Sequence, residues 1–368
     1  MTYMKYISKW YIACLALVFC CWVSACSDEE EFVPVEVSFT APASLPTFLS
    51  FSAVGGYEER RGPLGEKFDI TDPDEKFGQK TWEEAEGEMS RLALNMSLSK
   101  VGMSHTALEV IVAGDLQNQC VASSLGLQSF GVPYLGVYGA CSTATESLLL
   151  LSLLLSNSGG VGAAVTSSHN SVAERQFRNP VEYGGQRSPS AQWTSTAAAA
   201  FILTGRPCRD GVCITECMPG RMVDGGTTDG SNMGGAMAFA AADSIISYFD
   251  TAGCKPTDFD YVVTGDLGAV GTRVLYELLQ DRYPAVISRH LDCGNLLYDA
   301  KRRDVHAGAS GCGTSASVLA THFLPMLAGG DIGRVLFLST GALMSPSSLM
   351  QGHNIIGIAP VIRIERLG

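Results

Sequence analysis

One cysteine stands in a stretch whose pattern suits chemistry at a thiol. Cys141 follows the short apolar segment 133–138 and precedes a strongly apolar run, residues 148–155. The first segment predicts a short buried strand, and the second predicts a buried helix that ends near residues 156–160. Cys141 would therefore lie at a strand-to-helix turn, where backbone N–H groups can lower the pKa of a thiol or bind an anion. A cysteine beside small residues can equally be packing filler, and spacing alone leaves both interpretations open.

The sequence contains an internal repeat. Residues 108–116 and 259–267 are apolar segments that each end in Gly-Asp-Leu, and each follows a predicted helix, residues 82–101 and 237–252. A helix-strand unit repeated at so long a period predicts two similar α/β halves related by a pseudo-twofold axis. Ligand sites in such sheets lie beyond the strand ends, where the loops converge.

The repeat extends to the turn that carries the cysteine. Residues 139–155 match residues 311–327, and an apolar strand pattern follows each of them. In this alignment Cys141 lies opposite Gly313, next to Cys312. We therefore expect the two turns to face one pocket between the halves.

The composition is that of a globular chain with a sizeable core. The 368 residues are 46% hydrophobic and 17% charged, with 40 glycines. Alternating strand and helix patterns indicate an α/β fold, with halves at residues 47–210 and 211–368. The formal net charge of −12, without any basic block, argues against nucleic acid as the main partner.

The twelve cysteines do not form a recognisable framework. They are scattered along the chain, which argues against a set of disulfides in a chain of this size. Cys208, Cys213 and Cys217 cluster without a histidine or a fourth cysteine at zinc-finger spacing. We interpret this cluster as a β-hairpin region and predict no metal site.

The first 26 residues differ from the rest of the chain. Lysines precede an apolar segment, residues 10–22, and Val-Ser-Ala-Cys follows at 23–26. This pattern is typical of a membrane-targeting signal, and its ending resembles a bacterial lipobox that would make Cys26 the lipidated first mature residue. An upstream start codon that adds untranslated residues is the alternative. Residues 27–46 are acidic and contain prolines, which indicates a solvated linker.

The duplicated layout, with a cysteine at the start of a buried helix, resembles the thiolase fold shared by thiolases and ketoacyl synthases. This resemblance implies a layered αβαβα arrangement of two pseudo-twofold-related halves. Cys141 occupies the position of the acyl-accepting nucleophile in that superfamily. Residues 305–311 are similar to the thiolase Gly-His-Pro-x-Gly-x-Ser-Gly segment, without the proline and one residue shorter, which implies that His306 faces the pocket.

A closer resemblance, from about residue 47 to the end, is to the stage V sporulation protein AD family. The motifs that carry it lie at residues 62–65, 113–119, 138–143, 166–170, 173–180, 182–187, 264–268, 292–294, 308–313 and 339–346. The resemblance implies a protein that binds dipicolinic acid, free or with calcium. It also implies cooperation with the other stage V sporulation A membrane proteins, and a place at the spore inner membrane, peripheral or lipid-anchored, or otherwise in the forespore. Relatives of this fold imply a homodimer.

The alternative function is acyl transfer. Cys141 and His306 could supply a nucleophile and its partner. Residues 265–268, however, stand where ketoacyl synthases carry a histidine, and Asp266 there would oppose a forming negative charge rather than stabilise it. We therefore favour a binding protein over an enzyme and expect no required cofactor.

Binding of dipicolinate needs forked donors for two carboxylates and an apolar slot for the ring. Arg175 and Arg187 lie in a polar, motif-dense loop, and helix N–H groups near Ser142 can add donors. Glu174 and Arg175 can equally form a structural ion pair, and His169 can be a core or interface histidine.

The second half contributes further candidates. Asp292 and Cys293 form a polar turn next to the expected pocket, where a carboxylate could share a calcium ion with the ligand. Asp266 and Asp115 repeat at matched strand ends, which suits turn capping as well as function. The expected site residues are Cys141, Ser142, His169, Arg175, Arg187, Asp266, Asp292, Cys293, His306 and Cys312.

Overall fold

The computed structural model describes residues 42, 44–177, 187–206, 210–299, 301 and 305–368. The chain divides into residues 1–37 and 38–368, and the second unit carries every described element. The signal-like segment, the expected lipidation at Cys26, most of the 27–46 linker and Cys208 lie outside the described residues. No helix in the part of the chain that is described is long and apolar enough to span a membrane.

The strands form one large sheet and two small ones. They are β1 (Thr47–Gly55), β2 (Ile70–Thr71), β3 (Val110–Gly114), β4 (Tyr134–Gly136), β5 (Val161–Ser168), β6 (Trp193–Thr194), β7 (Ala197–Thr204), β8 (Gly211–Met218), β9 (Val223–Asp224), β10 (Tyr261–Thr264), β11 (His290–Asp292), β12 (Ala309–Ser310), β13 (Arg334–Leu338), β14 (Gly341–Leu343), β15 (Ile356–Ile358) and β16 (Val361–Leu367). The large sheet follows the order β11-β10-β13-β16-β8-β1-β7-β5-β3-β4, with β2 beside β1. The small sheets pair β12 with β6, and β14 with β15 and β9.

The order of the large sheet confirms the internal repeat. Read outward from β1, the strands are β1-β7-β5-β3-β4, and read outward from β8 they are β8-β16-β13-β10-β11. In each series the first two pairings are antiparallel and the last two are parallel. The two series meet where Thr47 of β1 pairs with Cys213 of β8.

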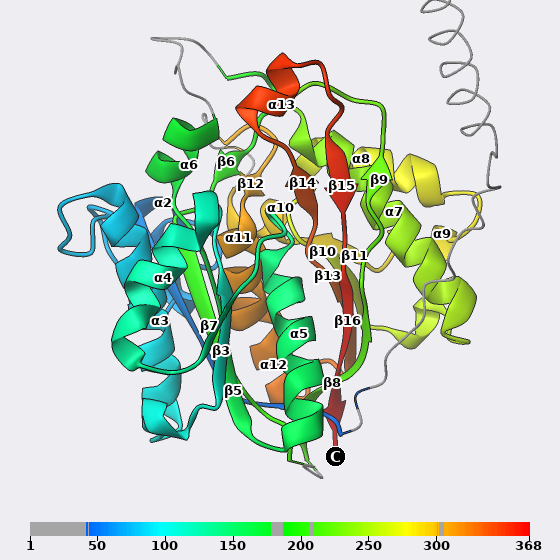
Figure 1. Cartoon of the computed structure of the whole chain (residues 1–368). Helices are drawn as coiled ribbons and strands as arrows, with labels where there is room; N and C mark the ends of the chain where they lie inside the picture. The colour runs from blue at the N-terminus through cyan, green and yellow to red at the C-terminus, as the bar shows by residue number, and fades with distance from the viewer. Residues whose placement is uncertain (1–41, 43, 178–186, 207–209, 300, 302–304) are drawn as a thin grey trace, which may run out of the picture. The chain divides into compact units, whose positions relative to one another are not determined.

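The helices are arranged in layers around this sheet. They are α2 (Tyr57–Arg60), α3 (Trp82–Lys100), α4 (Val121–Leu127), α5 (Thr143–Ser158), α6 (Asn170–Phe177), α7 (Met233–Thr251), α8 (Gly268–Leu279), α9 (Pro284–Ile287), α10 (Cys293–Leu297), α11 (Cys312–Val318), α12 (Leu324–Gly329) and α13 (Pro346–Met350). Figure 1 shows α3 and α4 outside one half of the sheet and α7 and α8 outside the other, with α5, α11 and α12 between the halves. This is the layered αβαβα arrangement that the resemblance to the thiolase fold implies.

Paired glycines let the outer helices of each half touch. A side-chain carbon on Gly126 of α4 would lie 2.0 Å from the carbonyl oxygen of Gly87 in α3. A side-chain carbon on Gly271 of α8 would likewise lie 2.4 Å from the carbonyl oxygen of Gly234 in α7. Because such distances are far below van der Waals contact, only glycine permits these helix crossings.

The central helices differ from each other in their regularity. Helix α5 runs without a break to Gly159, which takes the left-handed conformation (φ 67°) that commonly ends helices. Its counterpart begins at Cys312 and contains a π-helical turn over Leu319–Phe323. Pro325 follows that turn, and its missing N–H group explains why the regular bonding pattern is interrupted there.

Two sequence predictions about local structure are wrong. Strand β4 is exposed rather than buried, because it forms the edge of the large sheet. The described part of the expected hairpin, residues 210–217, does not pair with β7, because β1 lies between β7 and β8 and β8 pairs with β16 instead. No disulfide joins the described cysteines, which include Cys213 and Cys217.

Candidate functional site

Cys141 lies at the predicted strand-to-helix turn. Ala140 adopts the left-handed conformation (φ 52°), which non-glycine residues rarely do. The backbone N–H group of Ser142 donates to the carbonyl of Gly139 at 3.0 Å, and α5 begins at the next residue. This turn places the Cys141 side chain at the wall of a cavity. Only 5% of the surface of Cys141 is exposed.

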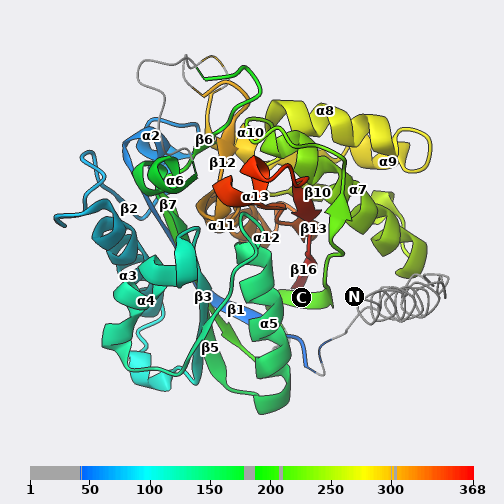
Figure 2. The ribbon, with the colours of Figure 1, turned by 45° about the horizontal axis from the view of Figure 1, so that its top comes forward.

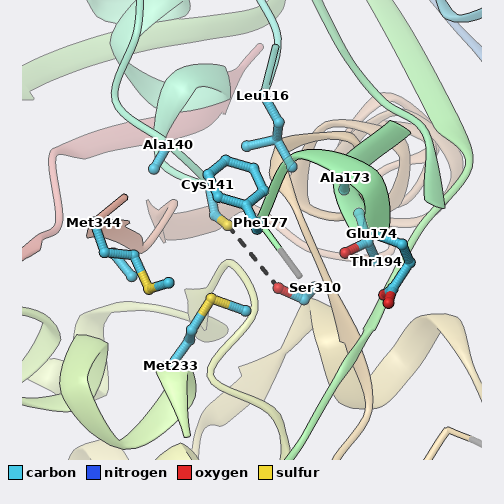
Figure 3. Close-up of a pocket in the computed structure, with 11 residues that line it drawn as sticks. Leu116, Ala140, Cys141, Ala173, Glu174, Phe177, Thr194, Met233, Ser310 and Met344 are labelled. Carbon is cyan, nitrogen blue, oxygen red and sulfur yellow. Dashed lines mark hydrogen bonds between the residues drawn. The ribbon is translucent and has the colours of Figure 1, made fainter. Parts of the chain in front are cut away.

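The cavity is small and mostly apolar. Its lining residues are Leu116, Ala140, Cys141, Ala173, Glu174, Phe177, Thr194, Met233, Ser310, Ala342 and Met344. Figure 3 shows the Phe177 ring beside Cys141, with the side chains of Met233 and Met344 directed into the same space. The volume open to the centre of a water molecule is about 40 Å³, which suits roughly three water molecules.

The Cys141 thiol belongs to a buried chain of polar groups. Its sulfur lies 4.0 Å from the Ser310 hydroxyl, which donates to the Asp266 carboxylate at 3.1 Å. Asp266 also accepts from the Gly311 N–H group at 2.8 Å and from the Thr340 hydroxyl at 2.9 Å. The sequence-predicted pair Cys141 and Asp266 is thus brought together, with Ser310 between them.

Burial controls the protonation of Asp266 and Cys141 in this series of polar groups. It raises the pKa of Asp266 to about 7, since the carboxylate is shielded from water and Asp292 lies nearby. Burial, followed by the charge of Asp266, raises the pKa of the Cys141 thiol well above its ordinary value. The expected lowering of this pKa by helix N–H groups is therefore outweighed, and the thiol is held protonated at neutral pH.

Asp292 and Cys293 are adjacent to these buried polar groups but do not line the cavity. The Asp292 carboxylate accepts from the N–H groups of Leu267 (2.8 Å), Gly268 (2.9 Å) and Asn295 (3.1 Å) and from the Thr264 hydroxyl (2.7 Å). These four donors make it the cap of α10 and a clamp on the 265–268 turn. Cys293 is fully buried, and burial raises the pKa of its thiol.

His290 is a buried histidine that the sequence reasoning did not weigh. The Thr264 hydroxyl donates to Asp292 and therefore accepts from Nε2–H of His290, at 2.8 Å. Its Nδ1 then accepts from the Tyr276 hydroxyl at 3.2 Å. Burial lowers the pKa of His290 to about 4, so this imidazole is neutral. Both of its ring nitrogens are hydrogen-bonded within the second half, to Thr264 and Tyr276.

The two histidines expected from the sequence, His169 and His306, are not beside Cys141. His169 accepts from the N–H group of Ser171 at 3.2 Å and donates from Nε2 to the carbonyl of Glu75 at 2.9 Å, with the Trp82 ring 5.2 Å away. Burial lowers its pKa, which fits a neutral structural histidine. His306 is half-buried in a left-handed turn (φ 45°) and is not a lining residue.

The two arginines lie at the border of the site. Arg175 is exposed and forms an ion pair with Glu83 across to α3. Arg187 forms an ion pair of 3.0 Å with Glu174, a lining residue, and its guanidinium lies 4.5 Å from the centre of the Trp193 ring. Arg187 is therefore one side chain away from the cavity. The alternative of a buried ion pair between Glu174 and Arg175 is wrong, because Glu174 pairs with Arg187 and the exposed Arg175 pairs with Glu83.

Ser142 and Cys312 point away from the cavity. The Ser142 hydroxyl lies 2.6 Å from a Glu146 carboxylate oxygen and 2.7 Å from the carbonyl of Gly139. Cys312 is fully buried, and its thiol donates to the carbonyl of Ser167 at 2.9 Å. The residue before Cys312, Gly311, has a positive φ of 97°, so on backbone conformation Cys141 matches Cys312 rather than Gly313.

The sequence reasoning missed most of the cavity wall. Ser310 and Met344 belong to motifs that the sequence analysis singled out, and that membership was the available signal. Phe177 has the same signal, because it lies in the 173–180 motif. Thr194 of β6 and Met233 at the start of α7 lie outside all of these motifs and carry no such signal. Within the described residues, no group of three or more His, Cys, Asp or Glu side chains is placed to hold a metal ion.

Comparison with known proteins identifies the family. Residues 38–365 match the family described as Stage V sporulation protein AD (SpoVAD). The chain is 39% identical over 326 residues to the stage V sporulation protein AD of Bacillus subtilis strain 168, which covers 88% of this chain and 95% of that protein.

Solved structures of condensing enzymes share the fold. The tetronic acid condensing enzyme AbyA1 matches with a TM-score of 0.56 and 16% identity, over 87% of this chain and 99% of that one. The 3-oxoacyl-[acyl-carrier-protein] synthase III of Aquifex aeolicus VF5 matches with a TM-score of 0.55 and 12% identity, over 86% and 99%. The chain is therefore a sporulation protein of the stage V sporulation protein AD family, built on the fold of thiolase-like condensing enzymes.

Proposed function

We propose that this protein binds dipicolinic acid in the cavity beside Cys141 and supports its uptake into, and release from, the spore. The observation that carries the proposal is membership of the SpoVAD family over nearly the whole described chain. The cavity supports it, since it combines apolar walls with a few convergent polar groups, as ligand sites usually do.

The charges around the cavity favour the calcium complex over the bare dianion. Glu174 lines the cavity and Asp266 lies behind Ser310. The two carboxylates of bare dipicolinate would therefore be repelled by like charge. Arg187 offsets Glu174 through their ion pair. Dipicolinate with one calcium ion has no net charge, and calcium prefers oxygen ligands of the kind that both partners offer. We therefore expect calcium to travel with the ligand.

Acyl transfer by Cys141, the alternative, gains less support. Its thiol is held protonated by burial and by Asp266, which lowers the fraction of the reactive thiolate. The described lining residues include no histidine that could take the proton. Binding needs neither feature.

Calorimetric titration of the full chain with dipicolinate, with and without equimolar calcium, tests the proposal. We expect saturable binding that is at least several-fold tighter with calcium. Ala342→Leu should weaken it, because Ala342 lines the cavity and a larger side chain would fill it. Leu125→Ala, at an exposed position on α4, serves as the control that leaves binding unchanged. A correctly folded protein that shows no heat at millimolar ligand would refute the proposal.

The proposal includes membrane partners at the spore inner membrane, where the protein would be peripheral or lipid-anchored. It also includes a homodimer. Exposed apolar side chains gather on β4 and α5, namely Tyr134, Leu135, Leu150 and Leu154. Strand β4 is a sheet edge with unpaired backbone groups, which a second copy could pair in antiparallel fashion. Leu154→Glu should therefore shift the sedimentation velocity toward the monomer, whereas Leu125→Glu on α4 should not.

A further inference from the structure

A second, larger hollow adjoins the Cys141 cavity. We call it the outer cleft, and its lining residues are Asn118, Gln119, Tyr138, Gln176, Phe177, Met344, Ser345, Pro346 and Ser347. The volume open to the centre of a water molecule is about 520 Å³. Phe177 and Met344 line both spaces and form the wall between them. Figure 2 shows α6 and α13, which carry or flank these residues, at the same end of the molecule.

The wall of the outer cleft is polar without being charged. Tyr138 is 45% exposed and offers a flat aromatic surface. Asn118 and Gln119 are exposed and offer amide donors, and Ser345 and Ser347 offer hydroxyls. None of the described lining residues is acidic, in a chain whose formal net charge is −12. An anionic ligand therefore meets less repulsion here than beside Glu174.

The amide-bearing loop is held in a defined position. The Gln176 side chain accepts from the N–H group of Asn118 at 3.1 Å and donates to the carbonyl of Leu116 at 2.7 Å, which ties the loop to α6. Gln119 and Cys120 both adopt left-handed conformations (φ 60° and 53°). Two successive strained residues persist only where the surroundings fix them, and such strain gathers at binding sites.

The two spaces differ in what they can hold. About 40 Å³ suits a few waters, whereas dipicolinate is a rigid aromatic ring with two carboxylates. About 520 Å³ lies within the usual size of small-molecule sites. The inner cavity must widen to take the ligand, and the side chain best suited to that is the flexible Met344.

The geometry points to the outer cleft as a second binding site for the same class of ligand, a planar heteroaromatic dicarboxylate. The ring lies against Tyr138, and the amides of Asn118 and Gln119 meet the carboxylates. Phe177 and Met344 separate this molecule from the inner cavity, to which it passes when they move. The inference rests on the proposed function for the identity of the ligand.

The test is the stoichiometry of dipicolinate binding by the full chain in the presence of calcium. Calorimetry should find two molecules per chain. Tyr138→Ala should weaken one of the two sites roughly tenfold, because it removes the aromatic surface. Tyr138→Phe keeps the ring and should leave both sites intact. Ala342→Leu, which fills only the inner cavity, should remove the other site. Melting temperatures confirm that each variant is folded.

Each outcome decides between the two proposals. One molecule per chain, lost in Ala342→Leu and unaffected by Tyr138→Ala, would overturn the outer site and leave the proposed function standing. One molecule per chain, weakened by Tyr138→Ala and unaffected by Ala342→Leu, would support the outer site and overturn binding beside Cys141. The absence of any binding would overturn both.

Discussion

The two Gly-Asp-Leu turns occupy equivalent places in the repeat and hold their carboxylates in different ways. Asp115, after β3, accepts from the N–H groups of Gln117 and Ser123 and from the Ser123 hydroxyl, all within eight residues. Asp266, after β10, draws its donors from Ser310, Gly311 and Thr340, which lie 44 to 74 residues away. Asp115 therefore caps a local turn, whereas Asp266 joins separate segments beneath the Cys141 cavity.

Each of these aspartates has a second buried carboxyl group beside it. In the first half it is Glu86 of α3, which accepts from only two side chains, Gln117 at 2.9 Å and Ser167 at 3.2 Å. In the second half it is Asp292, with four donors. Glu86 lies on α3 and Asp292 at the end of β11, so the second acids come from elements that are not equivalent in the repeat. The second pair is connected to the cavity wall through the bond between Asp266 and Ser310.

The first pair should make stability depend on pH. Burial raises the pKa of Glu86 from 4.5 to about 8, so the folded chain keeps a proton that the unfolded chain loses between these values. Stability then falls as the pH rises from about 4.5 to 8, by up to about 5 kcal/mol from this group. Urea unfolding at pH 5, 6.5 and 8 measures it. Glu86→Gln should flatten the slope and stabilise the protein at pH 8.

Glu66→Gln is the matched control for that experiment, because Glu66 is exposed. It should retain the slope of the unsubstituted chain. If Glu86→Gln retained it as well, the first pair would not be the source of the pH dependence.

Asp292 should be the more costly carboxylate to delete. Asp292→Ala leaves three N–H groups and the Thr264 hydroxyl without their acceptor in a buried position. We expect a loss of about 4 kcal/mol in the free energy of unfolding, since unsatisfied buried donors cost more than an average hydrogen bond contributes. Asp292→Asn retains one acceptor oxygen and should lose about half as much. Equal losses in both variants would argue against hydrogen bonding as the cause.

The two cysteine turns extend the comparison to the backbone. Gly311 has a φ of 97°, and a side-chain carbon there would lie 2.9 Å from the Ser168 hydroxyl. Gly311→Ala should therefore destabilise the fold by about 2 kcal/mol in chemical unfolding. At the matching position Ala140→Gly should change it by less than about 1 kcal/mol, because relief of the left-handed strain offsets the greater freedom of the unfolded chain. A larger loss at Ala140 than at Gly311 would contradict the matching of the two turns.

The sequence predicts the scaffold better than it predicts the cavity. The repeat is visible in it because strand and helix periodicity and the Gly-Asp-Leu ends are local patterns, and the strand order confirms it. Cys141 and Asp266 could be placed together because both follow matched strand ends. Met233 and Thr194 could not, because their position in the cavity depends on how segments far apart in the sequence meet. The exposure of β4 also escaped prediction, since an edge strand has the same local pattern as a buried one.

Alkylation of the thiols offers the smallest and most direct contrast between the halves. Cys141 lines a cavity, whereas Cys312 is fully buried and hydrogen-bonded to the Ser167 carbonyl, so iodoacetamide at pH 8.5 should modify Cys141 before Cys312. The charge of Asp266 helps to raise the pKa of Cys141, so Asp266→Asn should speed its modification roughly tenfold, the equivalent of one pKa unit. Peptide mass spectrometry follows each cysteine separately. Because the Cys312 thiol is hydrogen-bonded to the Ser167 carbonyl, its rate of alkylation should not change. An equal acceleration of both thiols would mean that the substitution had loosened the fold. No acceleration at Cys141 would mean that burial alone keeps the proton on this thiol.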